Sequence, residues 1–522
     1  MAALALRPYQ KECVDQAVDR QNLLIAMVMG AGKTAAALRT VRTLRQMGEV
    51  TSGAIFALNS TKFQWLEEIA KWDRTALAQV VDGDKRARTI QIRRAERYHY
   101  TILHYETLVN DWDTIRNWLP IDFIIGDEIT AIKGFKAKRT RRMKAMRQYT
   151  PYRFGLSGQP IENRPEELFS IMEFIDPEVL GAFPKFDRTF IERDIWGKPT
   201  KYKNLPLLRK RMQDAMFRRS REDIAEWLPE RVEMEIPVKL GQRAMALHDL
   251  VRDDLLVALD QAIEVGVGGG FDLLVHYGRA PKDHIETMSL RGQVMARLLA
   301  MRMLASHPAL LTWSADQFDD PASGHGSQYA SELRERGVLN NLPQKHEKLS
   351  VLIETIEEIL AEDPKHKVVV FSYFKPMLRL IGKELSKAKV PFTTITGDVP
   401  AAERHERITQ FNNDPRCKAF LSSDAGAFGI SLGAGSHLLC YDFPWSAGLL
   451  NQRVSRIDRT NSDWSTITIG YMYGSGTIEE RMYGQLMEKM AVADAWLDGK
   501  FDPRSGALAL DLQSLREFLI SS

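Results

Sequence analysis

The sequence has few cysteines and no long apolar run. Its three cysteines, Cys13, Cys417 and Cys440, lie far apart and outside any CxxC or Cys/His spacing. This excludes a zinc finger and a disulfide-rich scaffold, and it suits a reducing compartment. No stretch approaches the roughly 18 apolar residues of a membrane span, and the start lacks the pattern of a signal peptide. We therefore expect a cytoplasmic protein without a membrane segment.

A strong excess of one charge is also absent. The 71 Lys and Arg residues face 68 Asp and Glu residues, so the formal net charge is only +3. Overall charge therefore does not by itself indicate a nucleic-acid partner, and local basic clusters carry that argument. At 522 residues and 44% hydrophobic content, the chain is long enough to build several cores.

Short apolar runs alternate with helical patterns in two parts of the chain. NLLIAMVM and DFIIGDE belong to the first series, and KVVVFSYF and HLLCYDF belong to the second. This alternation predicts repeated βα units around parallel sheets, hence an α/β fold. The stretch between the two series lacks strand-like runs and is predicted to be helical. The expected parts are a first α/β domain over 1–177, a helical insertion over 178–345, a second α/β domain over 346–500 and a helical tail over 501–522.

The string MGAGKT lies between an apolar run and a helix-forming stretch. Glycines in such a turn let backbone amides point at phosphate oxygens, and the positive start of the next helix adds to the field on the anion. Lys33 would reach the β- and γ-phosphates, and Thr34 would bind Mg²⁺. The full GxxxxGK[ST] pattern is not met, because Met27 stands at the first glycine. The predicted phosphate loop consists of Met29, Gly30, Ala31, Gly32, Lys33 and Thr34.

Two carboxylates follow the apolar run DFIIG, at the carboxyl edge where parallel sheets bind ligands. We predict that Asp127 holds Mg²⁺ through water and that Glu128 is the general base for an attacking water. In the second half, Gln452, Arg456 and Arg459 have the i, i+4, i+7 spacing of one helix face. They are candidate catalytic residues, with the arginines as arginine fingers. A solvated basic helix face is the alternative on spacing alone.

Taken in order, these strings resemble the Swi/Snf-like ATPases of helicase superfamily two, of the bacterial or phage type, along nearly the whole chain. LRPYQ, MGAGKT, GDEITAIKG, LSGQPIENRPEELF, LSSDAGAFGISL and NQRVSRIDR match motifs of that family in the family's order. The resemblance implies two RecA-like domains in tandem and a nucleic-acid-stimulated ATP hydrolase. It also implies nucleotide contacts at Arg7, Gln10 and Gly429, and coupling between nucleotide and nucleic acid at Ser157 and Gln159.

The resemblance further implies contacts to a nucleic-acid backbone without sequence specificity. A basic stretch from Lys133 to Arg147 has eight Lys or Arg among fifteen residues and directly follows the carboxylates. It would bind phosphates, with a solvated helix face as the alternative. The predicted nucleic-acid contacts are Lys62, His104, Tyr105, Lys138, Arg141, Ser372, Ser422 and Ser423.

The expected function is a monomeric motor that uses ATP and Mg²⁺ to move along duplex DNA. Unwinding of RNA, or unwinding or annealing of forked DNA, is the alternative within the same enzyme class. A DNA-binding scaffold gated by ATP, with weak turnover, is the alternative outside it. The reason is that this chain reads DEIT where the family usually has DEAH.

Overall fold

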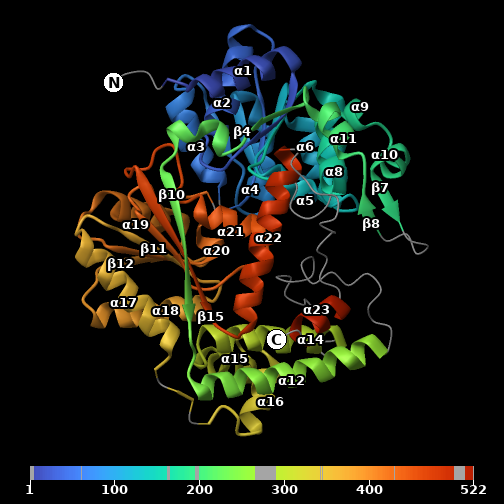
Figure 1. The fold of residues 1–522 in the computed structure, drawn as a ribbon. Helices are drawn as coiled ribbons and strands as arrows, with labels where there is room; N and C mark the ends of the chain where they lie inside the picture. Colours follow the sequence, from blue (N-terminus) through green and yellow to red (C-terminus); the bar gives the residue numbers. More distant parts are fainter. Residues whose placement is uncertain are drawn as a thin grey trace. The chain divides into compact units, whose positions relative to one another are not determined.

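Two parallel β-sheets organise the chain in the computed structural model (Figure 1). The structure describes residues 5–59, 61–160, 165–193, 199–264, 290–340, 342–343, 345–427, 429–498 and 512–520. The first compact unit contains Met1–Pro229, Asp458–Asn461 and Ala491–Ala507. The second contains Glu230–Ile457, Ser462–Met490 and Leu508–Ser522. The predicted pair of parallel-sheet domains is thus confirmed, while the predicted domain boundaries stay predictions.

The first sheet has the strand order β3-β4-β2-β5-β6-β1-β9, and every pairing is parallel. Alternate residues of β1 enter two different cores, because successive side chains of a strand point to opposite faces. Both faces of the sheet are therefore buried. The strands are β1 (Asn22–Met27), β2 (Gly53–Ala57), β3 (Ala78–Val80), β4 (Tyr100–His104), β5 (Phe123–Gly126), β6 (Tyr152–Leu156) and β9 (Met216–Arg219).

Helices cover both faces of this sheet, as parallel strands require for their crossover connections. One core contains side chains of α1, α2 and α3, and the other contains side chains of α8 and α10. The helices are α1 (Pro8–Arg20), α2 (Lys33–Gln46), α3 (Lys62–Trp72), α4 (Lys85–Arg93), α5 (Thr107–Asn110), α6 (Trp112–Trp118), α7 (Lys138–Ala145), α8 (Pro165–Ile175), α9 (Pro177–Leu180), α10 (Phe183–Phe190) and α11 (Leu205–Met212).

The second sheet has the order β10-β15-β14-β11-β13-β12 and is also parallel throughout. Its strands are β10 (Glu230–Val238), β11 (Val368–Phe371), β12 (Phe392–Ile395), β13 (Ala419–Ser422), β14 (His437–Cys440) and β15 (Thr466–Gly474). The helices of this half are α12 (Gln242–Glu264), α14 (Leu290–Ser306), α15 (Ala309–Asp319), α16 (Gln328–Glu335), α17 (Glu347–Glu362), α18 (Lys375–Lys387), α19 (Ala401–Asn413), α20 (Asp424–Ala427), α21 (Ala447–Val454), α22 (Ile478–Asp498) and α23 (Leu512–Ile520).

The prediction that residues 178–345 contain no strands is wrong. β7 (Ile191–Arg193) and β8 (Pro199–Tyr202) form an antiparallel pair, β9 joins the first sheet beside β1, and β10 joins the second beside β15. β9 and β10 are edge strands, which are only partly buried, so their sequences MFRR and ERVEMEIPV mix charged with apolar residues. Neither strand therefore shows the continuous apolar run that is typical of a central parallel strand.

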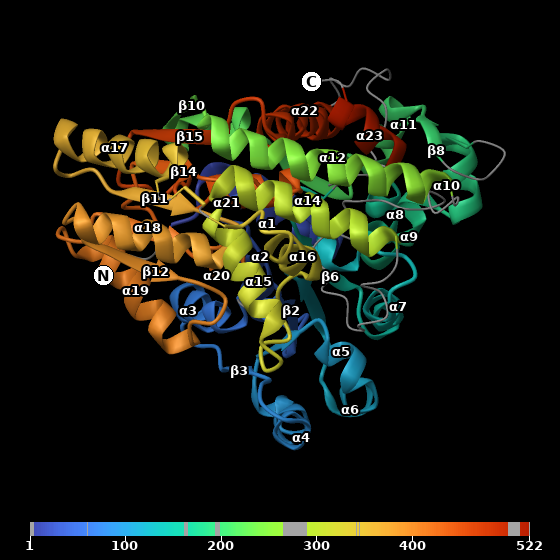
Figure 2. The ribbon, with the colours of Figure 1, turned by 90° about the horizontal axis from the view of Figure 1, so that it is seen from below.

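The helices α12 to α16 share a core with the second sheet. α12 and α14 lie side by side (Figure 2), and their buried residues Leu255 and Leu298 belong to the same cluster as Val369 of β11. The predicted helical insertion therefore contributes to the packing of the second unit. Of the predicted C-terminal tail, residues 512–520 form α23, and residues 501–511 lie outside the described part.

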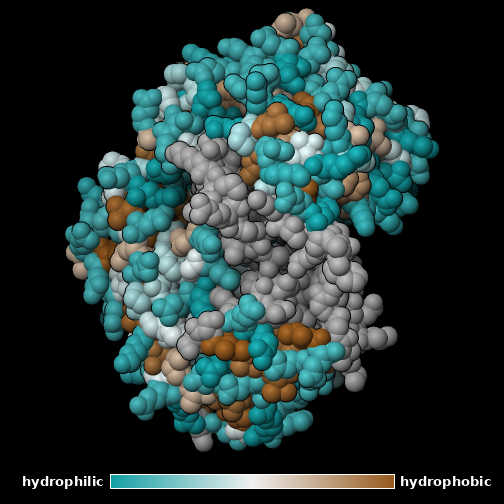
Figure 3. Space-filling model, turned by 45° about the vertical axis from the view of Figure 1, so that its right-hand side comes forward, coloured by the Kyte–Doolittle hydropathy of each residue, from teal (hydrophilic) through white to brown (hydrophobic). Residues whose placement is uncertain are grey.

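The described surface is mainly hydrophilic in the view of Figure 3. Exposed apolar side chains are scattered, for example Met47, Trp118 and Val257. Scattered exposure of this kind is normal for a folded protein. Among the described helices, none has the length and apolar content that crossing a bilayer would need.

A buried ion pair joins two helices of the second unit. Lys348 of α17 pairs with Glu479 of α22, and their side chains are 0% and 3% exposed. The same carboxylate accepts hydrogen bonds from the Gly474 amide and the Ser306 hydroxyl. Breaking a pair of this kind leaves one buried charge without its partner, which is costly.

We expect Lys348→Ala to destabilise the second unit by about 3–5 kcal/mol, because Glu479 would stay buried without its counter-ion. Hydrogen exchange of the β15 amides reports this loss. Lys387→Ala is the control, because that lysine side chain is 62% exposed and should change stability by less than about 0.5 kcal/mol. Equal exchange rates in both variants would contradict the stabilising role of the buried pair.

Candidate functional site

The predicted phosphate loop forms a tight turn between β1 and α2. Gly30 and Gly32 have φ values of 81° and 79°, a left-handed conformation that favours glycine. α2 begins at Lys33, so its free backbone amides point into the turn. The Lys33 Nζ donates to the carbonyls of Met27 at 3.2 Å and Val28 at 3.4 Å. This geometry suits an anion, because amides, helix start and ammonium converge on one place.

Helix α1 supports the loop from behind. The Tyr9 hydroxyl and the Gln10 Nε2 both donate to the Ala31 carbonyl at 2.9 Å. A Cβ on Gly32 would lie 2.3 Å from the Gln10 Nε2, so a larger residue there would displace the Gln10 side chain. The Arg7 amide donates to the Gln10 Oε1 at 2.9 Å, which fixes the start of α1. Gln10, which is predicted to contact the nucleotide, also supports the loop.

The predicted carboxylates follow β5 at the same sheet edge. The Asp127 Oδ2 accepts a hydrogen bond from the Trp65 Nε1 at 3.0 Å, and the Asp127 carbonyl accepts one from the Tyr105 hydroxyl at 2.8 Å. Glu128 has a φ of 45°, which is uncommon outside glycine. It therefore turns the chain sharply directly after the strand. The part played by Trp65 was not predicted, because it depends on a contact across 62 positions of sequence.

Burial raises the pKa of the Asp127 carboxyl above its ordinary value, against the hydrogen bond from Trp65 and the charge of Lys33. Asp127 and Lys33 are therefore electrostatic neighbours, although they follow different strands. A carboxylate and an ammonium at one sheet edge can bind a metal ion and a phosphate together.

The predicted coupling residues Ser157 and Gln159 follow β6, which lies between β5 and β1. Both are buried, and the backbone N–H of Gln159 donates to the Ser157 Oγ at 3.1 Å. The Ser157 amide donates to the Ile25 carbonyl of β1. This loop therefore adjoins the strand that carries the phosphate loop.

The prediction of one helix that carries Gln452, Arg456 and Arg459 is wrong in its second half. α21 ends at Val454, so both arginines lie beyond it. Beyond the helix, the Arg456 amide donates to the Arg453 carbonyl, and the Arg456 carbonyl accepts from the Leu432 amide, both at 3.0 Å. The Arg456 Nη1 donates to the Ile430 carbonyl at 3.3 Å. The helical spacing therefore does not define the directions of the two arginines.

A buried arginine that was not predicted organises the neighbouring loops. Arg453 is 1% exposed and donates to both carboxylate oxygens of Asp424, at 2.5 and 2.8 Å. It also lies 3.7 Å from an oxygen of Asp442, which accepts from the Ser372 hydroxyl at 2.5 Å. Its place next to Gln452, a predicted catalytic residue, was the only sequence signal. The network joins the ends of β11, β13 and β14 to α21.

The predicted nucleic-acid contacts differ in exposure. Lys138 and Arg141 are exposed on α7. Lys62 is 4% exposed and pairs with Asp82 at 2.6 Å, and His104 ends β4 with its pKa lowered by burial. Tyr105, Ser372, Ser422 and Ser423 are buried. Gly429, predicted to contact the nucleotide, has a φ of 79°. The Ser423 hydroxyl has no hydrogen-bond partner within the described residues.

Two family models match the chain. A SNF2-related domain covers residues 9–264, and a helicase conserved C-terminal domain covers residues 347–461. The chain belongs to the Swi/Snf-like ATPases of helicase superfamily two. The residues of the phosphate loop, the carboxylates and the two arginines all lie inside these matches. The assignment to a bacterial or phage type stays a prediction.

Similar proteins include the mouse DNA repair and recombination protein RAD54B, with 23% identity over 94% of this chain and 56% of that protein. The DNA annealing helicase and endonuclease ZRANB3 of Bos taurus has 22% identity over 95% of this chain and 41% of that protein. The chain thus spans about half the length of the curated relatives it matches. The Pyrococcus furiosus Hef helicase domain has a TM-score of 0.52 and 16% identity, over 92% of this chain and 98% of that one, which supports the same fold.

We expect Asp127→Asn to raise the thermal stability of the chain at pH 7 without nucleotide. The raised pKa means that the folded state binds this proton more tightly than the unfolded state does, so ionised Asp127 costs stability. The gain should be full at neutral pH and should disappear as the pH falls toward the ordinary carboxyl pKa. Melting curves at several pH values measure it. Asp113→Asn is the control, since that side chain is 82% exposed. A loss of stability at pH 7 in Asp127→Asn would refute the argument.

Proposed function

We propose that this chain is an ATP-driven motor that moves along duplex DNA. The observation that carries the proposal is at one edge of the first sheet, where a glycine-turned phosphate loop and a buried carboxylate lie close together. The family of ATPases to which the chain belongs supports the same reading.

ATP would lie with its triphosphate on the loop from Met29 to Thr34, with Arg7, Gln10 and Gly429 contributing to the nucleotide site. The ammonium of Lys33 would exchange two backbone carbonyls for the β- and γ-phosphate oxygens. Thr34 and Asp127 fit Mg²⁺, which is usually held by one or two protein oxygens together with substrate phosphates. When bound, this ion neutralises charge on the phosphates.

Hydrolysis needs a base for the attacking water. We assign this role to Glu128, which would accept the proton as the water oxygen bonds to the γ-phosphorus and the bond to the β-phosphate oxygen breaks. The products are ADP and inorganic phosphate. Trp65 and Tyr105 would position Asp127 through the two hydrogen bonds described above. We therefore assign Tyr105 to the ATP site instead of to the DNA contact that the sequence predicts for it.

Residues of the second predicted α/β domain, 346–500, would complete the site. Gln452, Arg456 and Arg459 would face the γ-phosphate when ATP draws the two domains together, and Ser157 and Gln159 would transmit the change. Hydrolysis would release the domains, and alternating grips would move the chain along one strand. Guanidinium groups in this role stabilise the charge of the transition state.

DNA is the proposed track, since the similar proteins include a DNA repair and recombination protein and a DNA annealing helicase. Exposed Lys138 and Arg141 suit phosphate contacts. The other proposed backbone contacts are Lys62, His104, Ser372, Ser422 and Ser423. We further propose that the motor works as a monomer in the cytoplasm.

Lys33→Ala and Glu128→Gln should each lower DNA-stimulated ATP hydrolysis by about 10²–10⁴-fold, because one removes the phosphate ligand and the other the base. Phosphate release with duplex DNA, single-stranded DNA or RNA measures the effect and the preferred track. Lys71→Ala is the matched control, with a side chain that is 54% exposed. Full turnover in either site variant would refute the assigned roles. Stimulation by RNA but not by DNA would refute the DNA motor.

Arg456→Ala or Arg459→Ala should lower turnover on the order of 10³-fold and leave ATP binding nearly unchanged. A fluorescent ATP analogue measures binding, and single-turnover hydrolysis measures the chemistry. Arg416→Ala is the control, since its side chain is 87% exposed. Because Arg456 is buried, Arg456→Lys is tested together with Arg456→Ala. This comparison separates the effect of losing the charge from the effect of losing the packing of the side chain. Loss of ATP binding with normal single-turnover rates would make these residues nucleotide anchors.

A further inference from the structure

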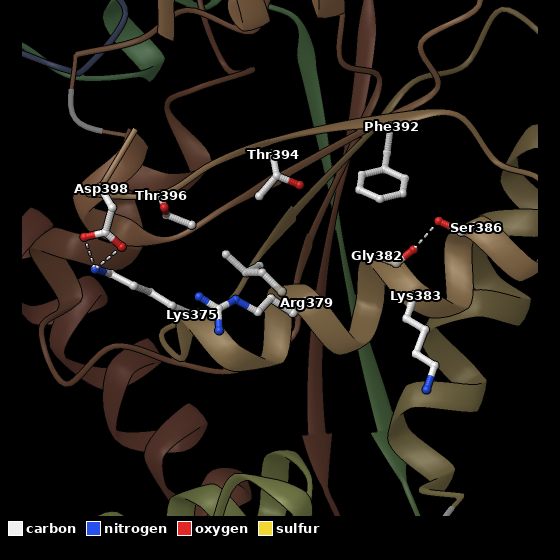
Figure 4. Close-up of a pocket in the computed structure, with 10 residues that line it drawn as sticks. Lys375, Arg379, Gly382, Lys383, Ser386, Phe392, Thr394, Thr396 and Asp398 are labelled. Atoms are coloured by element: carbon white, nitrogen blue, oxygen red, sulfur yellow. Dashed lines mark hydrogen bonds and ion pairs between the residues drawn. The ribbon is translucent and has the colours of Figure 1, made fainter. Parts of the chain in front are cut away.

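A groove with a volume of about 500 Å³ lies between α18 and β12 on the second unit (Figure 4). β12 is an edge strand of the second sheet, so the groove lies at the edge of that sheet. Its volume falls in the range of about 300–1,000 Å³ that is typical of ligand sites. None of the ATP or DNA residues proposed above lines it.

The floor of the groove is apolar. Phe392, half-buried, and Leu378, fully buried, both line it. A Cβ on Gly382 would lie 2.9 Å from the Phe392 Cζ, so the missing side chain lets the ring approach α18 closely. Figure 4 shows Phe392 and Thr394 on β12, on the side that faces α18, and Thr396 directly after the strand. The floor therefore offers an aromatic ring and hydroxyl groups to a ligand.

The helix wall carries positive charge. Arg379 and Lys383 are exposed and one helical turn apart, and neither forms an ion pair within the described residues. Lys375, at the end of the same row, pairs with Asp398 at 2.8 Å. In Figure 4 the Lys383 side chain extends away from β12, so its ammonium lies at the rim. Two cations beside an apolar floor are thus left for a ligand of opposite charge.

The spacing of these groups fits an extended chain. The two cations are four positions apart on the helix, which is a rise of about 6 Å along the axis. Alternate residues of an extended peptide are about 6.6 Å apart and point to the same side. Acidic side chains at alternate positions could therefore meet both cations, while the residues between them face Phe392. The charged groups are spread along α18. A site for a small molecule usually has a few polar groups that converge on one point, so this arrangement favours an elongated ligand.

We propose that this groove binds an extended segment of a partner protein in which acidic residues alternate with leucine or phenylalanine. Charge complementarity supplies the orientation and burial against Phe392 supplies affinity. A nucleic-acid strand is the weaker fit, because its phosphates gain nothing from the apolar floor. The proposal goes beyond the motor activity and does not depend on it.

The test uses the full chain and a fluorescein-labelled octapeptide that alternates glutamate with leucine and phenylalanine. Fluorescence anisotropy should show saturable binding, and Arg379→Glu with Lys383→Glu should weaken it at least tenfold, about 1.4 kcal/mol. The matched control is Lys387→Glu with Arg416→Glu, which makes the same charge change in the same unit outside the groove. It should change the affinity by less than about twofold.

Three further probes separate the possible results. A peptide with lysine in place of glutamate, and one with serine in place of the apolar residues, should both bind at least tenfold more weakly, about 1.4 kcal/mol. An oligothymidylate of twelve nucleotides should bind the groove variant and the control variant equally. Lys383→Ala, a milder change, should weaken peptide binding in the same direction. Three results would overturn the proposal. The peptide does not bind, both double variants lose peptide affinity equally, or the groove variant loses affinity for the oligonucleotide alone.

Discussion

The structure of the first unit depends on one constraint, the common direction of its strands. Because all seven strands are parallel, the loops after β1, β5 and β6 leave the sheet at the same edge. β6 separates β1 from β5, so the phosphate loop and Asp127 are two strand spacings apart, roughly 10 Å. The positive charge of Lys33 acts on the Asp127 carboxyl across this sheet edge and favours its ionised form. The loop with Ser157 and Gln159 lies between them.

Three residues distant in sequence, Tyr9, Gln10 and Trp65, hold this edge in place. Tyr9 and Gln10 fix the Ala31 carbonyl, and Trp65 fixes the Asp127 carboxylate. These hydrogen bonds are made in a buried setting, where an unsatisfied donor or acceptor would cost about 1–3 kcal/mol. They therefore stabilise one geometry of the loop and the carboxylate before any ligand arrives. Preorganisation of this kind is what stabilising a charged transition state requires.

The second unit uses a buried ionic network for the same purpose. Arg453 links Asp424 after β13 with Asp442 after β14, and Asp442 in turn binds Ser372 and the Tyr373 amide after β11. The loops of three neighbouring strands are thereby joined through one guanidinium. Removal of any member would leave buried charge, so the network acts as a unit. The helices α12 to α16 add packing to this sheet, as the shared core indicates.

Features that depend on residues adjacent in the sequence could be predicted from the sequence. The glycine turn before Lys33, the carboxylates after an apolar strand and the two parallel sheets follow from short patterns whose physical causes are local. Contacts between distant residues could not be predicted in this way. The Trp65 bond to Asp127, the ionic network of Arg453 and the end of α21 at Val454 arise only when separate strands and helices meet. The edge strands β9 and β10 were missed for the same reason, since a strand with charged and apolar residues becomes recognisable only through its neighbour in the sheet. Local sequence thus determined the chemical groups of the site and the parallel class of its sheets. Tertiary packing decided the order of the strands within each sheet and the orientation of the side chains, because hydrogen bonds and ion pairs depend on distance in space.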